Sequence, residues 1–444
     1  MASPTHDKVR ELQRTLYRTA KADPGRRFHA LYDKVHRADV LRRAWDQVRR
    51  NRGAAGIDHT TLADVQEYGI DRLLDELATE LAEHRWRPLP ARRVWIPKPG
   101  STEQRPLSIP TVRDRIVQTA TKIVIEPIFE ADMLDCSFGF RPKRAAHDAL
   151  QVLLDESWNR RRRWVVETDI ANCFEAIDHS KLMNAIAERI CDRHVLKLLS
   201  AMLRAGVMED GTVRRGSSGT PQGGVISPLL ANVFLTRLDR EWNAGRDGVL
   251  IRYADDLVVM CSSQRQAEHA LARLTGLLAD LGLQPKAAKT QIVHLTEGGA
   301  GFDFLGFHHR LVRGNTVRSR HFQFLARWPS RKAMQHARDR IRQLTARSRL
   351  AVDDEQIVQD INRFLRGWAG YFRYGNSARA FVKIRTYAIG RLALLVAKRH
   401  KQPRTYGWKV VVHLTDHMGL INLNGSVIAP RPNRDWRAPT ERIR

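Results

Sequence analysis

The sequence predicts an α+β fold, in which strands and helices fill most of the chain and a helical bundle follows them. Two short apolar runs flank a polar centre in Val249–Met260, which indicates a β-hairpin. Arg163–Ile170 reads as another strand and carries an aspartate near its end. After Pro329, apolar residues recur at helical spacing among many arginines, which is typical of amphipathic helices.

The chain is strongly basic. Its 444 residues include 75 Lys and Arg but only 48 Asp and Glu, a net charge of +27, and 43% of its residues are hydrophobic. The hydrophobic content predicts a folded protein. The charge indicates nucleic acid as the partner, because a polyanion would neutralise the excess. We find neither an apolar run long enough to span a membrane nor a secretory segment, so we expect no membrane partner.

The cysteines are widely scattered and include no C-x-x-C pair. They are Cys136, Cys173, Cys191 and Cys261. This spacing predicts neither a zinc site nor a disulfide framework. It fits a reducing compartment, and we therefore expect the protein in the cytoplasm.

Residues 5–52 have a helical pattern. Apolar residues recur there at helical spacing between arginines, at Val40, Leu41, Ala44, Trp45 and Val48. We interpret them as the buried stripe of an amphipathic helix. Two glycines then end the helix within Asn51–Asp58. This segment is either a loop that covers a substrate or a plain linker, and both interpretations stay open.

A hairpin is predicted within residues 91–118, because strand-like Val94–Ile96 and Leu107–Ile109 flank a Pro/Gly turn. Lys98 and Arg105 lie where the strands meet that turn. Two cations at a hairpin tip are suited to gripping a triphosphate. Solvated surface charges are the alternative. Helices are expected to follow over Asp114–Ile128 and Ala145–Arg160.

Three aspartates lie at the ends of predicted strands. Asp169 ends one strand, and Asp255 and Asp256 form the tip of the hairpin. If these strands share a sheet, the carboxylates meet, and their burial is costly without a counter-charge. Mg²⁺ prefers carboxylate oxygens. Three carboxylates from two strands would form a cradle for two ions about 3.5–4 Å apart, suited to in-line phosphoryl transfer. Taken alone, Tyr253–Asp256 also fits a solvated turn.

Polar residues also follow Asp169 closely along the chain. Glu175 and Asp178 are candidates for the same site, but their offsets from Asp169 suggest a different face. His179 fits a turn or the surface better than a ligand position.

A glycine-rich loop in Gly216–Asn232 leads into an apolar helix. Its glycines allow the backbone to approach a ligand closely, and Gln222 offers an amide there. A plain loop before a buried helix is the alternative. An amphipathic helix from about Gln264 to Leu281 and a short apolar strand over Phe302–Phe307 are predicted next.

Three basic amphipathic helices are predicted after Pro329. Their apolar stripes contain Met334, Ala337, Ile341 and Leu344, then Ile357, Ile361, Phe364, Leu365 and Trp368, then Phe381–His400. Arginines such as Arg338 and Arg342 surround the first stripe. We expect a small bundle that buries these stripes and offers cations to a nucleic-acid duplex.

Four motifs occur in a fixed order, and together they resemble those of a reverse transcriptase. They are Asp169-x4-Phe174, Pro221–Gly224, Tyr253–Asp256 and Phe304–Phe307. Other stretches resemble group II intron-encoded reverse transcriptases in particular, and the last of them resembles their maturase domain. These stretches are Gly53–Asp58, Ile96–Gln118, Ser227–Asn232 and Leu365–Phe372. The resemblance covers about residues 25–410.

The resemblance implies a right-hand polymerase with an antiparallel palm sheet, followed by an all-helical thumb. The expected parts are an N-terminal basic helical extension with a substrate-covering loop (1–75), fingers and palm (76–315), a thumb or maturase (X) domain (316–412) and a basic C-terminal tail (413–444). Many relatives end in a zinc-bearing HNH endonuclease. This sequence has no paired cysteines, so we expect a bacterial member without that domain.

The resemblance also implies roles for individual residues. Asp169, Asp255 and Asp256, with the Ile170 carbonyl, would hold two Mg²⁺ ions, with Mn²⁺ as the alternative metal. The expected nucleotide-binding residues are Lys98, Arg105, Phe174, Gln222, Gly223 and Tyr253, with Phe174 beneath the incoming ribose. The expected primer- and template-binding residues are Gly306, Arg338, Arg342 and Trp368.

The implied function is that of an RNA-directed DNA polymerase. It would extend a DNA or RNA primer along an RNA template with dNTPs, and would bind its intron RNA and a target DNA during splicing and mobility. Two alternatives stay open: a host-adapted relative used in defence or DNA repair, and an RNA-binding splicing factor without polymerase activity. The three intact aspartates argue against the splicing factor. Phe174 argues against an RNA-dependent RNA polymerase, because a bulky ring leaves no room for a ribose 2′-hydroxyl.

Overall fold

A computed structural model presents the fold of the chain. It describes residues 7–97, 104–209, 212–214, 216, 218–219, 223–314, 317, 320–414 and 419–437. Within these ranges strands and helices are mixed as far as β11, and only helices follow, which confirms a mixed α and β fold with antiparallel sheets. None of the helices in these ranges combines the length and apolar character needed to cross a membrane.

The N-terminal part is helical, and its first three helices pack against the long helix α6 (Val112–Glu130). The N-terminal helices are α1 (Lys8–Ala22), α2 (Tyr32–Val35), α3 (Ala38–Asn51), α4 (Leu62–Tyr68) and α5 (Ile70–Ala82). The helical region predicted over 5–52 is therefore three helices. The first helix ends before Asp23, because the proline that follows makes the helical conformation unfavourable for this residue. The five apolar residues predicted on α3 are all buried.

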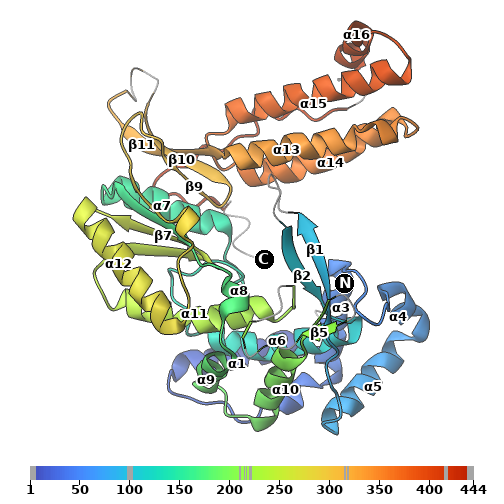
Figure 1. The fold of residues 1–444 in the computed structure, drawn as a ribbon, viewed down its shortest axis with the longest axis vertical. Coiled ribbons are helices and arrows are strands. Elements are labelled where there is room, and N and C mark those ends of the chain that lie inside the picture. Colours follow the sequence, from blue (N-terminus) through green and yellow to red (C-terminus); the bar gives the residue numbers. More distant parts are fainter. Residues whose placement is uncertain are drawn as a thin grey trace, which may run out of the picture.

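The predicted hairpin is confirmed as β1 (Ala91–Pro97) and β2 (Gln104–Ile109), with Ile96 opposite Arg105. Two strands that the sequence did not predict extend this sheet, β4 (Val207–Glu209) and β5 (Thr212–Arg214). In Figure 1 the described strands of the hairpin stand across the molecule from the central sheet, which carries Asp169 and Asp256.

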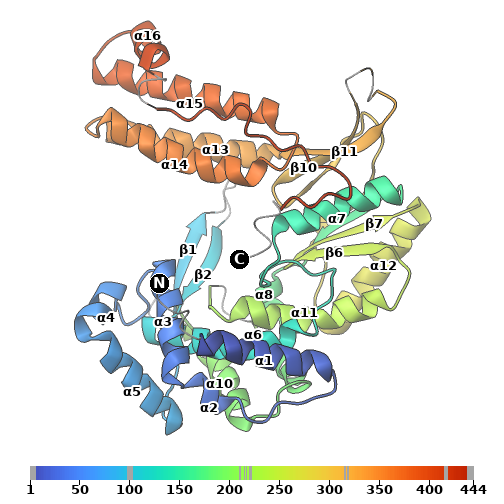
Figure 2. The same cartoon turned by 180° about the vertical axis from the view of Figure 1, so that it is seen from behind.

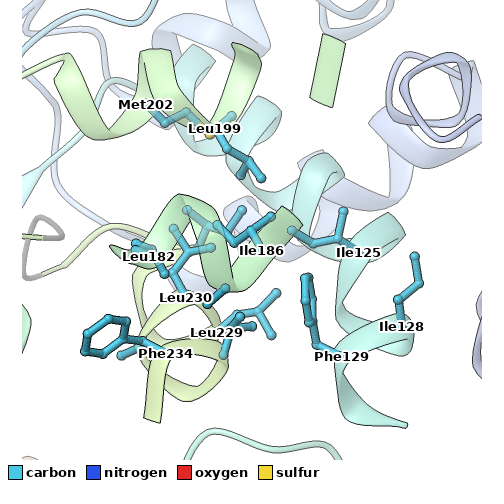
Figure 3. Packing of buried hydrophobic residues seen from close by; sticks show 14 of the residues in the cluster. Ile125, Ile128, Phe129, Leu182, Ile186, Leu199, Met202, Leu229, Leu230 and Phe234 are labelled. Carbon is cyan, nitrogen blue, oxygen red and sulfur yellow. The ribbon is translucent and has the colours of Figure 1, made fainter. Parts of the chain in front are cut away.

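Four helices share a hydrophobic core with one face of the central sheet. They are α6, α9 (His179–Ala187), α10 (Arg193–Arg204) and α11 (Ser227–Asn243). Figure 3 shows how side chains of these four helices meet: Ile125, Ile128 and Phe129 from α6, Leu182 and Ile186 from α9, Leu199 and Met202 from α10, and Leu229, Leu230 and Phe234 from α11. The close packing of all four helices fixes the position of the loops that connect them to the sheet.

The central sheet has the strand order β6-β7-β3-β8, and all its neighbours are antiparallel. Its strands are β3 (Trp164–Asp169), β6 (Val249–Tyr253), β7 (Asp256–Cys261) and β8 (Gln291–His294). Helices α7 (Ala146–Asn159) and α12 (Gln264–Leu281) pack on it. Alternate strand residues point to opposite faces, so Val165 joins one core cluster and Val166 the other. Burial on both faces explains the continuous apolar runs of the sequence.

A second antiparallel sheet contains β9 (Phe302–Phe304), β10 (Phe307–Arg313) and β11 (Gln323–Pro329). The single strand predicted over Phe302–Phe307 is wrong. Leu305 and Gly306 both have positive φ angles, 48° and 77°, and form a turn between β9 and β10. Beyond residue 316, where the helical domain was expected to begin, β11 comes first, and the helical part begins at Arg331.

The C-terminal part is a helical layer of α13 (Arg331–Leu344), α14 (Asp354–Phe372), α15 (Ala378–Arg399) and α16 (Arg404–Leu414). Short 3-10 helices occur at Ala287–Lys289 and Arg347–Arg349. The predicted stripes are largely buried, with Met334 and Phe364 only partly so. Figures 1 and 2 show this layer extending from the β9–β11 sheet over the β1–β2 hairpin.

The described part of the tail, residues 419–437, packs back onto the body of the protein. Asn362 of α14 donates a hydrogen bond to the Gly419 carbonyl (2.6 Å), and the Trp436 indole donates one to Asp148 of α7 (2.8 Å). In Figure 2 the dark red tail runs from the helical layer to α7. The tail therefore joins the C-terminal helices to the helix that covers the central sheet.

Candidate active site

The three aspartates meet at one end of the central sheet. Asp169, the last residue of β3, lies directly opposite Asp256, the first residue of β7. Directly opposed residues of antiparallel strands have Cβ atoms about 4.5–5.5 Å apart on the same face. Asp255 belongs to the two-residue turn between β6 and β7, and its carbonyl accepts a hydrogen bond from the Ile170 amide (3.0 Å). The predicted clustering of these carboxylates is thereby confirmed in geometry.

The hairpin turn depends on two backbone features. Ala254 has a φ of 57°, the positive value that the first residue of a type II′ turn requires. Gly139 packs directly behind it, and a Cβ on Gly139 would lie 2.5 Å from the Ala254 nitrogen. A side chain at residue 139 would therefore displace the turn that carries Asp255.

A buried arginine supports the same turn, and sequence reasoning did not identify it. The Arg252 guanidinium is fully buried and bonds both carboxylate oxygens of buried Asp239 (2.8 and 2.5 Å). It also donates to the Asn232 side chain (3.0 Å) and to the Ala254 carbonyl (3.1 Å). A buried charge is retained only when it is paired and hydrogen-bonded. Arg252 meets that condition and ties the turn to α11.

Lys289 is a second residue that sequence reasoning missed. Its ammonium group lies 2.5 Å from the Asp169 carboxylate and 3.9 Å from that of Asp256. Burial alone would lower the pKa of Lys289, but the hydrogen bond to Asp169 and the charges of the aspartates raise it. The only advance signal was its place in Gln284–Thr290, the segment before β8. The positive charge of Lys289 thus offsets part of the negative charge of the carboxylates.

The electrostatics of the site favour a cation. Burial, followed by the charge of Asp169, raises the pKa of Asp256 to about 7 and raises that of Asp255 as well. Such shifts mean that the ionised carboxylates lack sufficient counter-charge. No group of three His, Cys, Asp or Glu side chains in the described ranges is already arranged around a metal position. The donor chemistry nevertheless fits Mg²⁺, because all three side chains offer carboxylate oxygens and the Lys289 ammonium group already lies within 4 Å of two of them.

The residues expected beside the nucleotide come from three segments. Phe174 is half-buried in the short helix α8 (Cys173–Ala176), five residues after Asp169. Gly223 has a φ of 106° and packs on β2, where a Cβ would lie 2.6 Å from the Ser108 carbonyl oxygen. Arg105 on β2 is exposed, and Tyr253 is half-buried next to the turn. Lys98 and Gln222 lie outside the described residues.

The neighbouring polar residues have structural partners. Asp178 caps α9 by accepting a hydrogen bond from the Lys181 amide (2.8 Å). The His179 ring is hydrogen-bonded to the Gly219 carbonyl (2.7 Å), and Glu175 is exposed. His179 is thus the first residue of α9 and not a turn residue, and its ring is engaged by a backbone carbonyl.

A pocket of about 410 Å³ extends from the aspartates to the C-terminal helices and is lined by Asp256, Lys289, Gly306 and Trp368. Gly306, for which the resemblance implies a place near the primer end, lines the same pocket as Asp256. Trp368 is only 7% exposed and packs on Phe372 and Phe381, so it is mainly a core side chain that presents one edge to the pocket.

A larger groove of about 1650 Å³ adjoins this pocket, and Asp303 and Lys332 line both. Its lining is basic and includes Arg310, Arg331, Arg338, Arg379 and Lys383. Arg342, by contrast, is exposed, pairs with Asp339 (2.6 Å) and does not line the groove. The two arginines predicted to act together on α13 thus have different surroundings.

Comparison with protein-family models identifies two matches. Residues 96–309 match the model described as reverse transcriptase (RNA-dependent DNA polymerase). Residues 334–411 match the group II intron, maturase-specific domain. The first match contains all three aspartates, and the second coincides with the helical layer.

Several curated proteins are similar to the chain. Protein YkfC of Escherichia coli is 35% identical over 69% of this chain and 88% of its own length. The group II intron-encoded protein LtrA of Lactococcus lactis is 38% identical over 48% of this chain, but over only 35% of its own length. An uncharacterized 91 kDa protein in the cob intron of Schizosaccharomyces pombe is 26% identical over 87% of this chain and 56% of its own length. The chain thus spans most of the first relative and about a third of the second.

Proposed function

Because the chain belongs to the group II intron-encoded reverse transcriptase/maturase family, we propose that its carboxylate cluster copies an RNA template into DNA. The enzyme class is that of an RNA-directed DNA polymerase. One observation carries the proposal: Asp169 and Asp256 are directly paired across two strands, with Asp255 in the adjoining turn. This arrangement is suited to phosphoryl transfer between a primer end and a dNTP.

In the proposed mechanism, Asp169, Asp255 and Asp256, with the Ile170 carbonyl, would hold two Mg²⁺ ions. Bound Mg²⁺ would lower the pKa of the primer 3′-hydroxyl and neutralise the pyrophosphate leaving group. Arg252 and Gly139 keep the hairpin turn in place, so the carboxylates are positioned before substrate arrives. Lys289 balances their charge until the ions bind. Arg105 and Lys98 would hold the triphosphate, and Phe174 would lie beneath the sugar.

We assign the parts of a right hand to the elements. The β1–β2 hairpin and the helices around α6 would be fingers, the central sheet the palm, and α13–α15 the thumb. The basic groove beside α13 would hold the primer–template duplex, with Arg338 on a phosphate. Residues 1–75 would form a basic extension whose Asn51–Asp58 loop covers the substrate.

Intron RNA and a target DNA are the further partners that we propose. The maturase-domain match and the intron-encoded relatives support a role in splicing and mobility. Because all four cysteines are free, a reducing compartment suits the protein, and we propose the cytoplasm.

Primer extension on an RNA template with Mg²⁺ tests the proposed activity. Asp255→Asn removes one charge from the cluster with little change in volume. It should lower extension by several orders of magnitude while template–primer binding stays nearly unchanged. Asp75→Asn, an exposed carboxylate on α5, is the control and should extend normally. Substantial synthesis by Asp255→Asn would remove the assignment.

A further inference from the structure

Two exposed aromatic rings touch one another outside the groove. Trp158 lies at the C-terminal end of α7 and is 38% exposed, and Phe322 lies just before β11 and is 54% exposed. Their ring centroids are 6.2 Å apart, at an interplanar angle of 38°. Single exposed aromatics need no explanation, but two in contact form an apolar surface. Trp158 precedes β3 by a short connection, at the end of β3 opposite to Asp169.

Side-chain contacts fix a third segment beside this pair. Asn159, the residue after Trp158, exchanges side-chain hydrogen bonds with Asn433 of the tail (2.7 and 3.1 Å). The backbone N–H of Asn433 also donates a hydrogen bond to the Asp155 carboxylate of α7 (2.7 Å). The tail is therefore anchored at the end of α7, and it brings Arg434 to the same place.

The surroundings of the pair are basic. Arg160, Arg161, Arg320 and Arg434 are exposed, and none of them forms an ion pair with another described residue. The nearby acids are already engaged, because Glu156 pairs with Arg162 (2.8 Å) and Glu297 with Arg313 (2.6 Å). We define the α7-end patch as Trp158, Arg160, Arg161, Arg320, Phe322 and Arg434.

We propose that the α7-end patch binds a single-stranded segment of RNA. Unpaired bases stack on Trp158 and Phe322, and the adjoining phosphates contact the arginines. Aromatic platforms flanked by guanidinium groups suit this ligand, since stacking needs bases that are free of a duplex. None of the patch residues lines the groove or the pocket at the aspartates. The proposal is therefore independent of the polymerase activity, and RNA can be held there while the active site is occupied.

The test measures RNA binding with the groove already filled. The full-length protein is saturated with a blunt, chain-terminated RNA–DNA duplex. A fluorescent, unstructured RNA of about 12 nucleotides is then titrated and followed by anisotropy, a length that matches typical single-strand sites. Trp158→Ala combined with Phe322→Ala should raise the Kd for this RNA by at least about tenfold, because two stacking contacts are lost. Primer extension should be unchanged.

Matched variants separate stacking from charge and from misfolding. Tyr68→Ala removes an exposed aromatic ring at the end of α4, which contacts Arg72 of α5, and it should not alter RNA binding. The conservative pair Trp158→Phe and Phe322→Tyr should retain it. Equal affinity of the double alanine variant and the unchanged protein would overturn the proposal. A loss of RNA affinity that occurs only on charge reversal at Arg160 and Arg161, and not in the double alanine variant, would also overturn the proposal. Charge alone would then explain the binding, and any polyanion or acidic partner would fit the patch.

Discussion

Phe174 is the residue whose position bears most directly on the choice of sugar. It is half-buried in α8 and packs against the core cluster near the aspartates. We predict that Phe174→Val raises the kcat/KM for ribonucleotides relative to dNTPs by roughly 10–100-fold, because space for a 2′-hydroxyl is created. Single-nucleotide incorporation with each substrate measures this ratio.

The competing role for Phe174 is that of a core residue. In that case Phe174→Val would lower incorporation of both substrates in proportion and leave their ratio unchanged. Phe322→Val, an exposed Phe far from the site, is the control and should leave discrimination as it is.

Lys289 balances charge that a metal would otherwise balance. We predict that Lys289→Gln lowers the free energy of unfolding by about 1 kcal/mol in EDTA and by much less in saturating Mg²⁺. The figure is discounted for solvent screening, because the Lys289 side chain is 45% exposed. Urea unfolding with and without Mg²⁺ measures both values. Lys197→Gln, an exposed lysine on α10, serves as control. Equal destabilisation in the two conditions would contradict this role.

The sequence predicts some of these residues and not others, for a physical reason. Asp169, Asp255 and Asp256 were predictable because each lies at one end of an apolar strand or in the turn beside it, and that pattern is local. Lys289 and Arg252 were not, because an ammonium or guanidinium group in a sequence does not tell whether it is buried. Arg252 becomes a support of the turn only through Asp239 and Asn232 on α11, contacts that exist in the folded chain alone.

Among the elements, α6 carries a buried acid close to its first turn. Asp114 is 2% exposed and accepts a hydrogen bond from the Leu89 amide (3.2 Å). Burial raises its pKa to about 6, against about 3.9 in an unfolded chain. As pH rises, the Asp114 carboxyl therefore loses its proton in the unfolded state before it does so in the folded state. This difference lowers the free energy of unfolding as pH rises from about 4 to 6.

We predict that Asp114→Asn removes this loss. The stability of the variant relative to the unchanged protein should improve by up to about 3 kcal/mol between pH 4 and pH 7. Chemical denaturation across that range measures the difference. Asp75→Asn should run parallel to the unchanged protein, and a parallel curve for Asp114→Asn would show that its carboxyl is not shifted.

Periodicity predicted the elements unevenly. Helix α12 was expected from Gln264 to Leu281 and has those bounds, because its apolar stripe repeats over several turns. The sheet of β9, β10 and β11 was missed. Polar residues interrupt the apolar pattern of its buried side, because His309 of β10 lies opposite Arg327 of β11 and both side chains are buried.

At the scale of the whole molecule, the tail and α14 hold the helical layer against the palm side. Tyr371 of α14 donates a hydrogen bond to the Leu305 carbonyl in the β9–β10 turn (2.8 Å), and the His147 ring of α7 is hydrogen-bonded to the Tyr371 carbonyl (2.8 Å). Trp436 of the tail packs on His147. These contacts connect α7, α14, the tail and the β9–β10 turn, and they join residues too far apart in sequence for composition to predict.

The net charge of +27 predicts that template–primer affinity falls log-linearly with salt, because each neutralised phosphate releases counterions. Arg338 lines the groove, so Arg338→Glu should reduce the slope of log K against log salt by about one unit. Arg342 is one helical turn away, outside the groove and paired with Asp339, so Arg342→Glu should change the slope much less. Anisotropy titrations over a range of KCl concentrations measure both slopes. Equal slopes for the two variants would mean that the duplex does not follow the groove beside α13.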